Sequence, residues 1–321
     1  MAIDTTQATA ANRAKIYVNG VLQAVTVANG GIGPSTNWGF NTANTLNIVW
    51  STGSGGAGYG QPAEANVAVG DTVTAAKWAN LITKTSNSAS HQSSSITSVT
   101  APASGNTITY NANVVTNLQT TYVNRLNAVS QSGTSANTAT YAPTWLNAIT
   151  FTHIVTFANG DAARYFFNSG GQLAITCAHP AGTGINLLLN NLASNVGTVV
   201  LSSPTSGTAT IASTSYNGVT KVGGGGNAPT VSTNSGYYAW TTSNANVFTQ
   251  TASTGPASYL GTFIRVIVKT NGPVGSNGDV GNVVTIYTVW DEIPDGLTVG
   301  TGSTTTLTVR PPEVTNIANV P

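Results

Sequence analysis

Charged residues are scarce in this sequence. Lys and Arg contribute 10 residues and Asp and Glu contribute 9, which is 6% of 321 residues, whereas a soluble domain usually carries about 25%. Ser, Thr, Asn and Gly take the surface positions that charged side chains normally fill. Catalysis, phosphate binding and salt-bridge networks therefore have few residues to draw on, and we expect a structural protein that packs against its neighbours in many copies.

The few charges are also scattered, and the formal net charge is +1. No stretch forms the Lys and Arg stripe that counterion release on nucleic acid requires, so we expect no direct nucleic-acid binding. A net charge near zero gives weak self-repulsion, which favours association between copies of the chain. These features predict a homo-oligomer, such as a trimer or a ring.

Cysteine and long apolar runs are equally scarce. The one cysteine, Cys177, leaves no internal disulfide framework, and its apolar surroundings predict a small buried hydrophobic residue. Residues 1–15 lack the apolar region of a secretory signal, and no run of 18 apolar residues occurs. We therefore expect a chain made without a signal peptide and without a membrane span.

Short apolar runs separated by turn residues predict a mainly β fold. Asn19 and Gly20 lie between two β-branched runs and predict a hairpin over residues 15–27, which apolar residues up to Trp50 would extend. Residues 262–270 and 282–290 alternate apolar and polar side chains and predict a second hairpin. The run 305–311 predicts an edge strand that Pro311 and Pro312 end.

A β-meander is the expected arrangement from Trp145 onward. Its strands would be residues 149–157, 163–168 and 173–179, with a hairpin turn at Asn159, Gly160 and Asp161 and another at Gly170 and Gly171. In this interpretation Tyr165 and Phe167 share one face, Phe166 takes the other, and Arg164 lies beside Asp161. The Gly-rich and Ser-rich stretch 190–260 predicts long surface loops or decorated strands.

Two short helices are expected in the N-terminal half. Asp71 and Thr74 are candidate caps of a helix over about residues 75–88, in which Trp78 and Leu81 face one side. A second helix is expected over residues 113–131, with a heptad stripe that favours packing within the chain over a coiled coil. The predicted fold is therefore mainly β, an antiparallel β-sandwich or β-meander with two short helices.

The same patterns divide the chain into three parts. Residues 1–60 form an N-terminal hairpin and β region, residues 61–140 a helix-containing segment, and residues 141–321 one or more antiparallel β domains. The candidates for packing or for an interface between subunits come from the last two parts: Trp78, Leu81, Arg164, Tyr165, Phe166 and Phe167.

Patterns typical of enzymes and cofactor sites are weak. The run Gly53–Gly58 satisfies G-x-G-x-x-G, but no helix pattern or acidic residue follows at the spacing of a dinucleotide site. The histidines His91, His153 and His179 are far apart, and Asp291, Glu292 and Asp295 form the one acidic cluster, which is more typical of a solvated turn than of a calcium site. We expect no enzyme, no cofactor and no metal.

Two further expectations concern the surface and the stability. Tyr237, Tyr238 and Trp240 lie close together in the loop-rich region and are candidate glycan contacts, although core or interface packing is the favoured interpretation. Because paired carboxylates are few, linkage predicts a nearly flat unfolding midpoint between pH 5 and pH 9.

Several stretches resemble virion structural proteins of tailed bacteriophages, especially tail, neck, baseplate and fibre components of myovirus-like phages. They are YGQ at 59–61, VAVGDTVTAAKWANLITK at 67–84, HQ at 91–92 and FANGDAARYFFNSGGQLAIT at 157–176. The resemblance implies a part of the virion outside the DNA-filled interior, with other virion proteins as partners. The chain lacks an extended repeat, so a compact subunit fits better than a long fibre shaft.

The sequence therefore predicts a structural virion subunit that is made in the host cytoplasm and assembles by protein–protein contacts. Two alternatives stay open. One is a receptor-recognition protein that binds host-surface glycans through Tyr237, Tyr238 and Trp240. The other is a glycan-degrading enzyme on the virion, for which Asp291, Glu292 and Asp295 supply the clustered carboxylates that glycoside hydrolysis needs.

Overall fold

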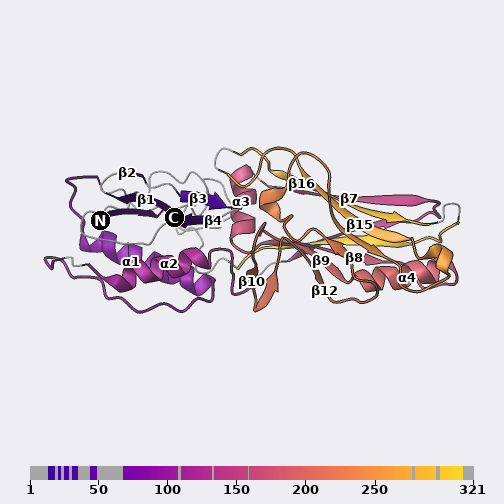
Figure 1. The fold of residues 1–321 in the computed structure, drawn as a ribbon, viewed down its shortest axis with the longest axis horizontal. Helices are drawn as coiled ribbons and strands as arrows, with labels where there is room; N and C mark the ends of the chain where they lie inside the picture. The colour runs from indigo at the N-terminus through magenta and orange to yellow at the C-terminus, as the bar shows by residue number, and fades with distance from the viewer. Residues whose placement is uncertain are drawn as a thin grey trace.

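Two sheets and a pair of helices occupy opposite ends of an elongated molecule (Figure 1). The computed structural model describes residues 14–18, 21–22, 25–28, 31–34, 44–48 and 68–313, apart from 108–109, 132–133, 158, 277–278 and 294–296. Helices α1 (Ala75–His91) and α2 (Ala112–Val123) lie at one end with the N-terminal strands. The fold is mainly β with antiparallel sheets, as the sequence predicts.

The larger end is built from two five-stranded antiparallel sheets. Sheet one has the order β12 (Val219–Val222), β9 (Thr198–Leu201), β8 (Gln172–Ala178), β17 (Ser303–Arg310) and β6 (Ser135–Tyr141). Sheet two has the order β13 (Thr230–Val231), β14 (Ala245–Thr251), β15 (Phe263–Thr270), β16 (Val283–Asp291) and β7 (Ala148–Thr156).

The main hydrophobic core joins the facing sides of these sheets. Leu173 and Ile175 of sheet one share this core with Ile264, Val266 and Ile286 of sheet two. Each of the five is 0% exposed. Strands β15 and β16 alternate buried and half-buried residues along their whole length, because successive side chains of a strand point to opposite faces. Their antiparallel pairing confirms the hairpin predicted over residues 262–290.

Helix α3 (Gly160–Asn168) replaces the hairpin predicted at Asn159–Asp161, so that prediction was wrong. The side chain of Asn159 accepts a hydrogen bond from the backbone N–H of Ala162 at 2.8 Å, which caps the helix N-terminus. Asp161 in the first turn interacts favourably with the helix dipole. The segment 163–168 is therefore helical, and Asn159 begins a helix instead of closing a turn between strands.

Helix α4 (Ile185–Val196) connects β8 to β9 and was not predicted. Its apolar side chains fall at helical spacing and are buried against the core, except for Leu187, which is 47% exposed. The helix packs against β8 of sheet one and against β14 and β15 of sheet two. The buried residues of α4 are Ile185, Leu188, Leu189, Leu192, Ala193 and Val196.

Strand β17 also departs from the prediction, because it is an interior strand. It pairs with β6 on one side, where Thr306 is opposite Thr138, and with β8 on the other, where Thr306 is opposite Thr176. The expected edge strand over 305–311 was therefore wrong about its position, although Pro311 does follow its last residue. Prolines beyond the strand end do not interfere with hydrogen bonding on either side.

Helices α1 and α2 correspond to the two helices predicted from the sequence. Thr74 caps α1 by accepting a hydrogen bond from the N–H of Lys77 at 3.2 Å. Helix α2 ends at Val123, earlier than the predicted residue 131, and packs against α1. The predicted intrachain packing of the second helix is thus confirmed for α2.

The remaining elements are small. Strands β1 (Ala14–Val18) and β2 (Val21–Leu22) pair antiparallel and confirm the start of the predicted hairpin. Trp50, at the end of the predicted extension, and the glycine run 53–58 lie outside the described residues. The other elements are β3 (Val25–Ala28), β4 (Gly31–Pro34), β5 (Asn44–Ile48), β10 (Ala209–Ile211), β11 (Thr214–Tyr216), η1 (Tyr237–Ala239) and η2 (Ala257–Tyr259).

Candidate functional site

An aromatic cluster unites two sets of residues that the sequence analysis considered separately. The ring of Phe167 on α3 stacks on Tyr237 of η1, with 4.4 Å between centroids and 16° between planes. Trp240 meets Phe167 edge-on at 5.3 Å, and Phe166 lies 5.0 Å from Phe167. Phe167 and Tyr237 are 0% exposed and Trp240 is 3% exposed, so the cluster is part of the core.

The burial of this cluster changes the interpretation of the candidate glycan contacts. Tyr237 and Trp240 have no ring face open to solvent, and burial raises the pKa of the Tyr237 hydroxyl. Tyr238 is half-buried and donates a hydrogen bond from its hydroxyl to the Asn168 side-chain oxygen. A stacking platform for sugars needs exposed ring faces, which Tyr237 and Trp240 do not offer.

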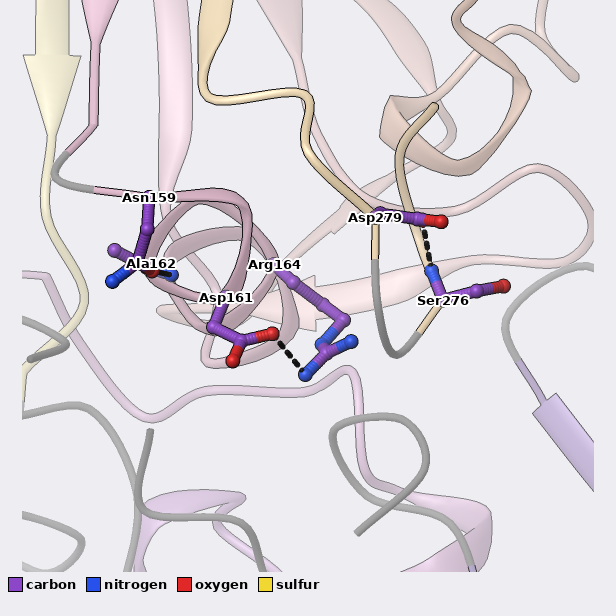
Figure 2. A network of polar contacts seen from close by, with 6 residues as sticks. All are labelled: Asn159, Asp161, Ala162, Arg164, Ser276 and Asp279. Carbon is purple, nitrogen blue, oxygen red and sulfur yellow. Dashed lines mark hydrogen bonds and ion pairs between the residues drawn. The ribbon is translucent and has the colours of Figure 1, made fainter. Parts of the chain in front are cut away.

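Figure 2 shows the polar contacts at the start of α3. Arg164 is 2% exposed, and its Nη2 lies 2.6 Å from Asp161 Oδ1 in an ion pair whose carboxylate partner is 37% exposed. The neighbouring turn is closed by a hydrogen bond from the backbone N–H of Ser276 to the Asp279 carboxylate. A Cβ at Gly160 would lie 2.4 Å from the carbonyl oxygen of Asp279, so this turn packs directly on α3.

The interface or packing candidates are therefore mostly internal. Tyr165, Phe166 and Phe167 are buried together with Arg164, and none of these four presents a free face in the isolated chain. Leu81 on α1 is also buried, and Trp78 is half-buried. The structure gives these residues a packing role and leaves the exposed surface to other residues.

Glu292 of the acidic cluster is a buried residue. Glu292 is 0% exposed, and its carboxylate accepts hydrogen bonds from the backbone N–H groups of Leu297 at 2.7 Å and Asn147 at 3.2 Å. Asp295 lies outside the described residues. Glu292 thus ties the chain before β7 to the chain before β17, and the described residues contain no group of three or more His, Cys, Asp and Glu arranged to hold a metal ion.

His179 belongs to a buried network at the start of β17. Its Nε2 lies 3.1 Å from the Asn186 side-chain oxygen, which also accepts the N–H of Gly300, so Nε2 carries the proton. The hydroxyl of Ser303 lies 2.9 Å from Nδ1 and accepts the indole N–H of Trp145 at 3.1 Å. With a neutral imidazole, each of these donors and acceptors has a partner. The network therefore holds the start of β17 in place.

All three histidines are buried and have lowered pKa values. Burial is the main cause at His91, His153 and His179, because desolvation disfavours the charged imidazolium. A backbone contact opposes the shift at His91, where the ring lies 3.0 Å from the carbonyl oxygen of Ser169. From these lowered pKa values we expect a loss of stability in mild acid, which differs from the flat pH dependence expected from the carboxylates alone.

Two other features are the single cysteine and a groove beside α1 and α2. Cys177 is half-buried in β8, and burial raises the pKa of its thiol to about 12, so the reactive thiolate is rare near neutral pH. A groove of about 420 Å³ lies between α1, residues 96–99 and α2. Its lining consists of Ile, Val, Thr, Ser and Asn side chains, among which Asn117 bonds both backbone groups of Thr97.

The strand order of the two sheets defines two pairs of edge strands. On one side the sheets end in β6 and β7, which pack near one another and which we call the β6–β7 edge. Neither strand contains Lys, Arg, Asp, Glu or Pro. β6 pairs with β17 over seven residues and β7 pairs with β16 over nine, without a register shift. The edge is long, regular and uncharged.

The opposite side, the β12–β13 edge, is built differently. β12 has four residues and β13 has two. Lys221 of β12 donates a hydrogen bond from Nζ to the carbonyl oxygen of Gly225 at 2.9 Å, and the same Gly225 donates its N–H to Asn195 at the end of α4. Short strands, a lysine and a covering turn are features that protect a sheet edge from pairing with another chain.

Comparison with family models, with curated proteins and with solved structures found no match to this chain. None of the helices in the described residues has the length and apolar character needed to span a bilayer.

Proposed function

We propose that this chain is a structural subunit of a tailed-phage virion that assembles by protein–protein contacts. The observation that carries the proposal is the β6–β7 edge, a long and uncharged pair of unprotected strands on a chain with 6% charged residues. An edge of this kind is a template for strand pairing with another chain. Monomeric proteins avoid such edges, so a place in an assembly accounts for it.

The virion part of the proposal comes from the sequence resemblance. The resembling segments include α1 and the stretch that runs from α3 into β8. These segments support the two ends of the molecule and the packing between them, since His91 at the end of α1 contacts Ser169 at the end of α3. Partners among other virion proteins, and a location in the tail, neck, baseplate or fibre, are parts of the same proposal.

No specific observation favours the two glycan alternatives. Two of the three candidate glycan contacts, Tyr237 and Trp240, are core residues. Glu292, the central carboxylate of the acidic cluster, is buried and bound by backbone N–H groups. Both alternatives stay predictions that adsorption and polysaccharide-cleavage assays would test.

Mass spectrometry of purified particles tests the proposal. Phage particles from the genome that encodes the chain are purified on a density gradient, and its peptides are quantified against those of the major tail protein. We expect the chain at a fixed copy number per particle, because symmetric assemblies contain set multiples of a subunit. Its absence from particles that retain infectivity would contradict the proposal.

A further inference from the structure

We propose that a second copy of this chain pairs with the first through β6, in an antiparallel arrangement centred on Thr138. The inference rests on the proposed assembly function and names the first partner in that assembly. The pairing would extend sheet one across a two-fold axis, with β6 of each copy lying beside β6 of the other.

Strand β6 is accessible to such a partner on both of its faces. Ala136, Asn137, Thr138 and Thr140 are exposed, and Tyr141 is 39% exposed. Among the described residues, β17 is the one strand that pairs with β6. In the part of the chain that the structure describes, no strand occupies the other side of β6, so a further strand can pair with its backbone there.

The sequence of β6 fits a copy of itself. Antiparallel pairing about Thr138 places Thr138 opposite Thr138 of the second copy, Asn137 opposite Ala139, and Ala136 opposite Thr140. None of these pairs brings like charges together, and opposed threonines are favourable cross-strand neighbours. The existing Thr138 and Thr306 pair, with 2.8 Å between hydroxyl oxygens, shows the same type of contact within the sheet.

Pairing between copies through unlike edges is less favourable. A head-to-tail arrangement would join β6 to β12 of the next copy, but β12 has four residues and its Lys221 is engaged with Gly225. A self-complementary edge needs no second surface, and its two-fold symmetry closes the assembly at two copies. The structure therefore favours the contact between identical strands.

Apolar side chains beside β6 enlarge the contact. Seven paired residues extend over only about 23 Å, and stable interfaces bury at least about 1,200 Å² in total. Tyr141 at the end of β6, Leu146 in the following loop and Ile154 on β7 are 39%, 53% and 62% exposed. Tyr141 and Ile154 belong to the two strands of the β6–β7 edge and Leu146 to the loop between them, so the contact can extend from β6 toward β7.

A cysteine at the centre of the pairing tests the geometry. In the full chain carrying Thr138→Cys, the two new sulfurs would lie on directly opposite residues, whose Cα atoms are about 4.5 to 5.5 Å apart in antiparallel sheets. That spacing suits a disulfide. We expect oxidised glutathione to convert most of this variant to a covalent dimer on a non-reducing gel.

The matched control carries the same change on the other side of the sandwich. Thr230 is an exposed threonine of β13, and Thr230→Cys should give at most one tenth of the dimer seen with Thr138→Cys. The native Cys177 contributes little background because of its raised thiol pKa. Equal cross-linking of both variants, or none with Thr138→Cys, would overturn the inference.

Charges introduced at residue 138 supply a second, independent test. Thr138→Lys and Thr138→Glu each place like charges face to face, and each should raise the dissociation constant of the dimer at least tenfold in sedimentation experiments. An equal mixture of the two should restore association, which misfolding would not do. Failure of the mixture to associate while circular dichroism shows folded chains would contradict pairing at β6.

The two proposals fail in different ways. A chain that is present in particles but shows neither cross-linking nor charge rescue keeps its virion function and loses the β6 pairing. A chain that dimerises through β6 but is absent from particles keeps the pairing and loses the virion function.

Discussion

The outermost strands differ between the two sides of the sandwich. At the β12–β13 edge the strands have four and two residues, Lys221 is present, and the turn after β12 contacts α4. At the β6–β7 edge the strands have seven and nine residues without Lys, Arg, Asp, Glu or Pro. One side is protected against further pairing, and the other is open to it.

This difference separates stability from association. The aromatic cluster and the buried face of α4 belong to the core of the sandwich, where His153 and His179 are also buried, and His91 is buried at the helical end. The β6–β7 edge contributes exposed polar and apolar groups that the isolated chain does not use for packing. Substitutions in the core should therefore change the free energy of unfolding, whereas substitutions at the edge should change the association constant.

The largest expected effect comes from the centre of the aromatic cluster. Phe167→Ala removes a fully buried ring that contacts Phe166, Tyr237 and Trp240, and we expect a loss of about 3 to 5 kcal/mol in the free energy of unfolding. Urea denaturation measures it. The half-buried Phe263 of β15 is the matched control, and a loss with Phe263→Ala as large as with Phe167→Ala would contradict the central role of the cluster.

Mild acid should lower the free energy of unfolding of the chain. The folded-state pKa values of His91, His153 and His179 are lowered, so below about pH 6.5 the unfolded chain binds more protons than the folded one. Each histidine that stays neutral in the folded chain then lowers the free energy of unfolding by up to about 1.4 kcal/mol per pH unit. The contribution of the three histidines to the free energy of unfolding should be complete above pH 6.5 and should be lost as the pH drops.

Urea midpoints at pH 7.5, 6.5 and 5.5 check this pH dependence. We expect similar midpoints at the two higher values and a clearly lower midpoint at pH 5.5. His179→Gln should reduce the difference, because it removes one of the three groups. A flat series down to pH 5.5, as the low content of paired carboxylates suggested, would show that the histidines do not control stability.

The joint between α3 and the β10–β11 hairpin should show a smaller effect. Gly170 has φ +94°, and a Cβ there would lie 2.5 Å from the Cβ of Ala128, so Gly170→Ala combines backbone strain with a clash and should cost about 2 to 3 kcal/mol. Gly105 has φ +86° with open space around it. Gly105→Ala measures the strain alone, and equal losses at both positions would exclude the clash.

The smallest change in stability is expected at the edge itself. Ile154 is 62% exposed on β7, and Ile154→Lys should change the free energy of unfolding by less than about 0.5 kcal/mol. The same substitution should weaken association several-fold, because it places a charge where the contact extends from β6 onto β7. Thr230→Lys on β13 is the control and should leave association unchanged. A large loss of stability with Ile154→Lys would erase the distinction between core and edge.

Local patterns predicted some elements and misled about others. Strict alternation identified β15 and β16, and Thr74 marked the start of α1. Asn159 and Gly160 suggested a hairpin turn, yet the same asparagine caps α3, and only the spacing of Ala162, Ala163, Phe166 and Phe167 distinguishes the two. The helical spacing of apolar residues in α4 was also present in the sequence.

Strand order was beyond the reach of these patterns. β17 lies between β6 and β8, which precede it by more than a hundred residues, so its interior position depends on tertiary packing. The same holds for the candidate surface, because β6 and β7 are edges only through that order. The contact between the aromatic residues at 165–167 and at 237–240 likewise became visible only in the fold.

The solution mass of the full chain over a range of concentrations tests the central claim most directly. Light scattering from about 1 to 100 μM should show a concentration-dependent rise from 32.5 kDa toward twice that mass, and Thr138→Lys should remain at the lower value. A mass of 32.5 kDa at every concentration would contradict an assembly through the open edge. A rise that Thr138→Lys does not alter would place the contact elsewhere on the molecule.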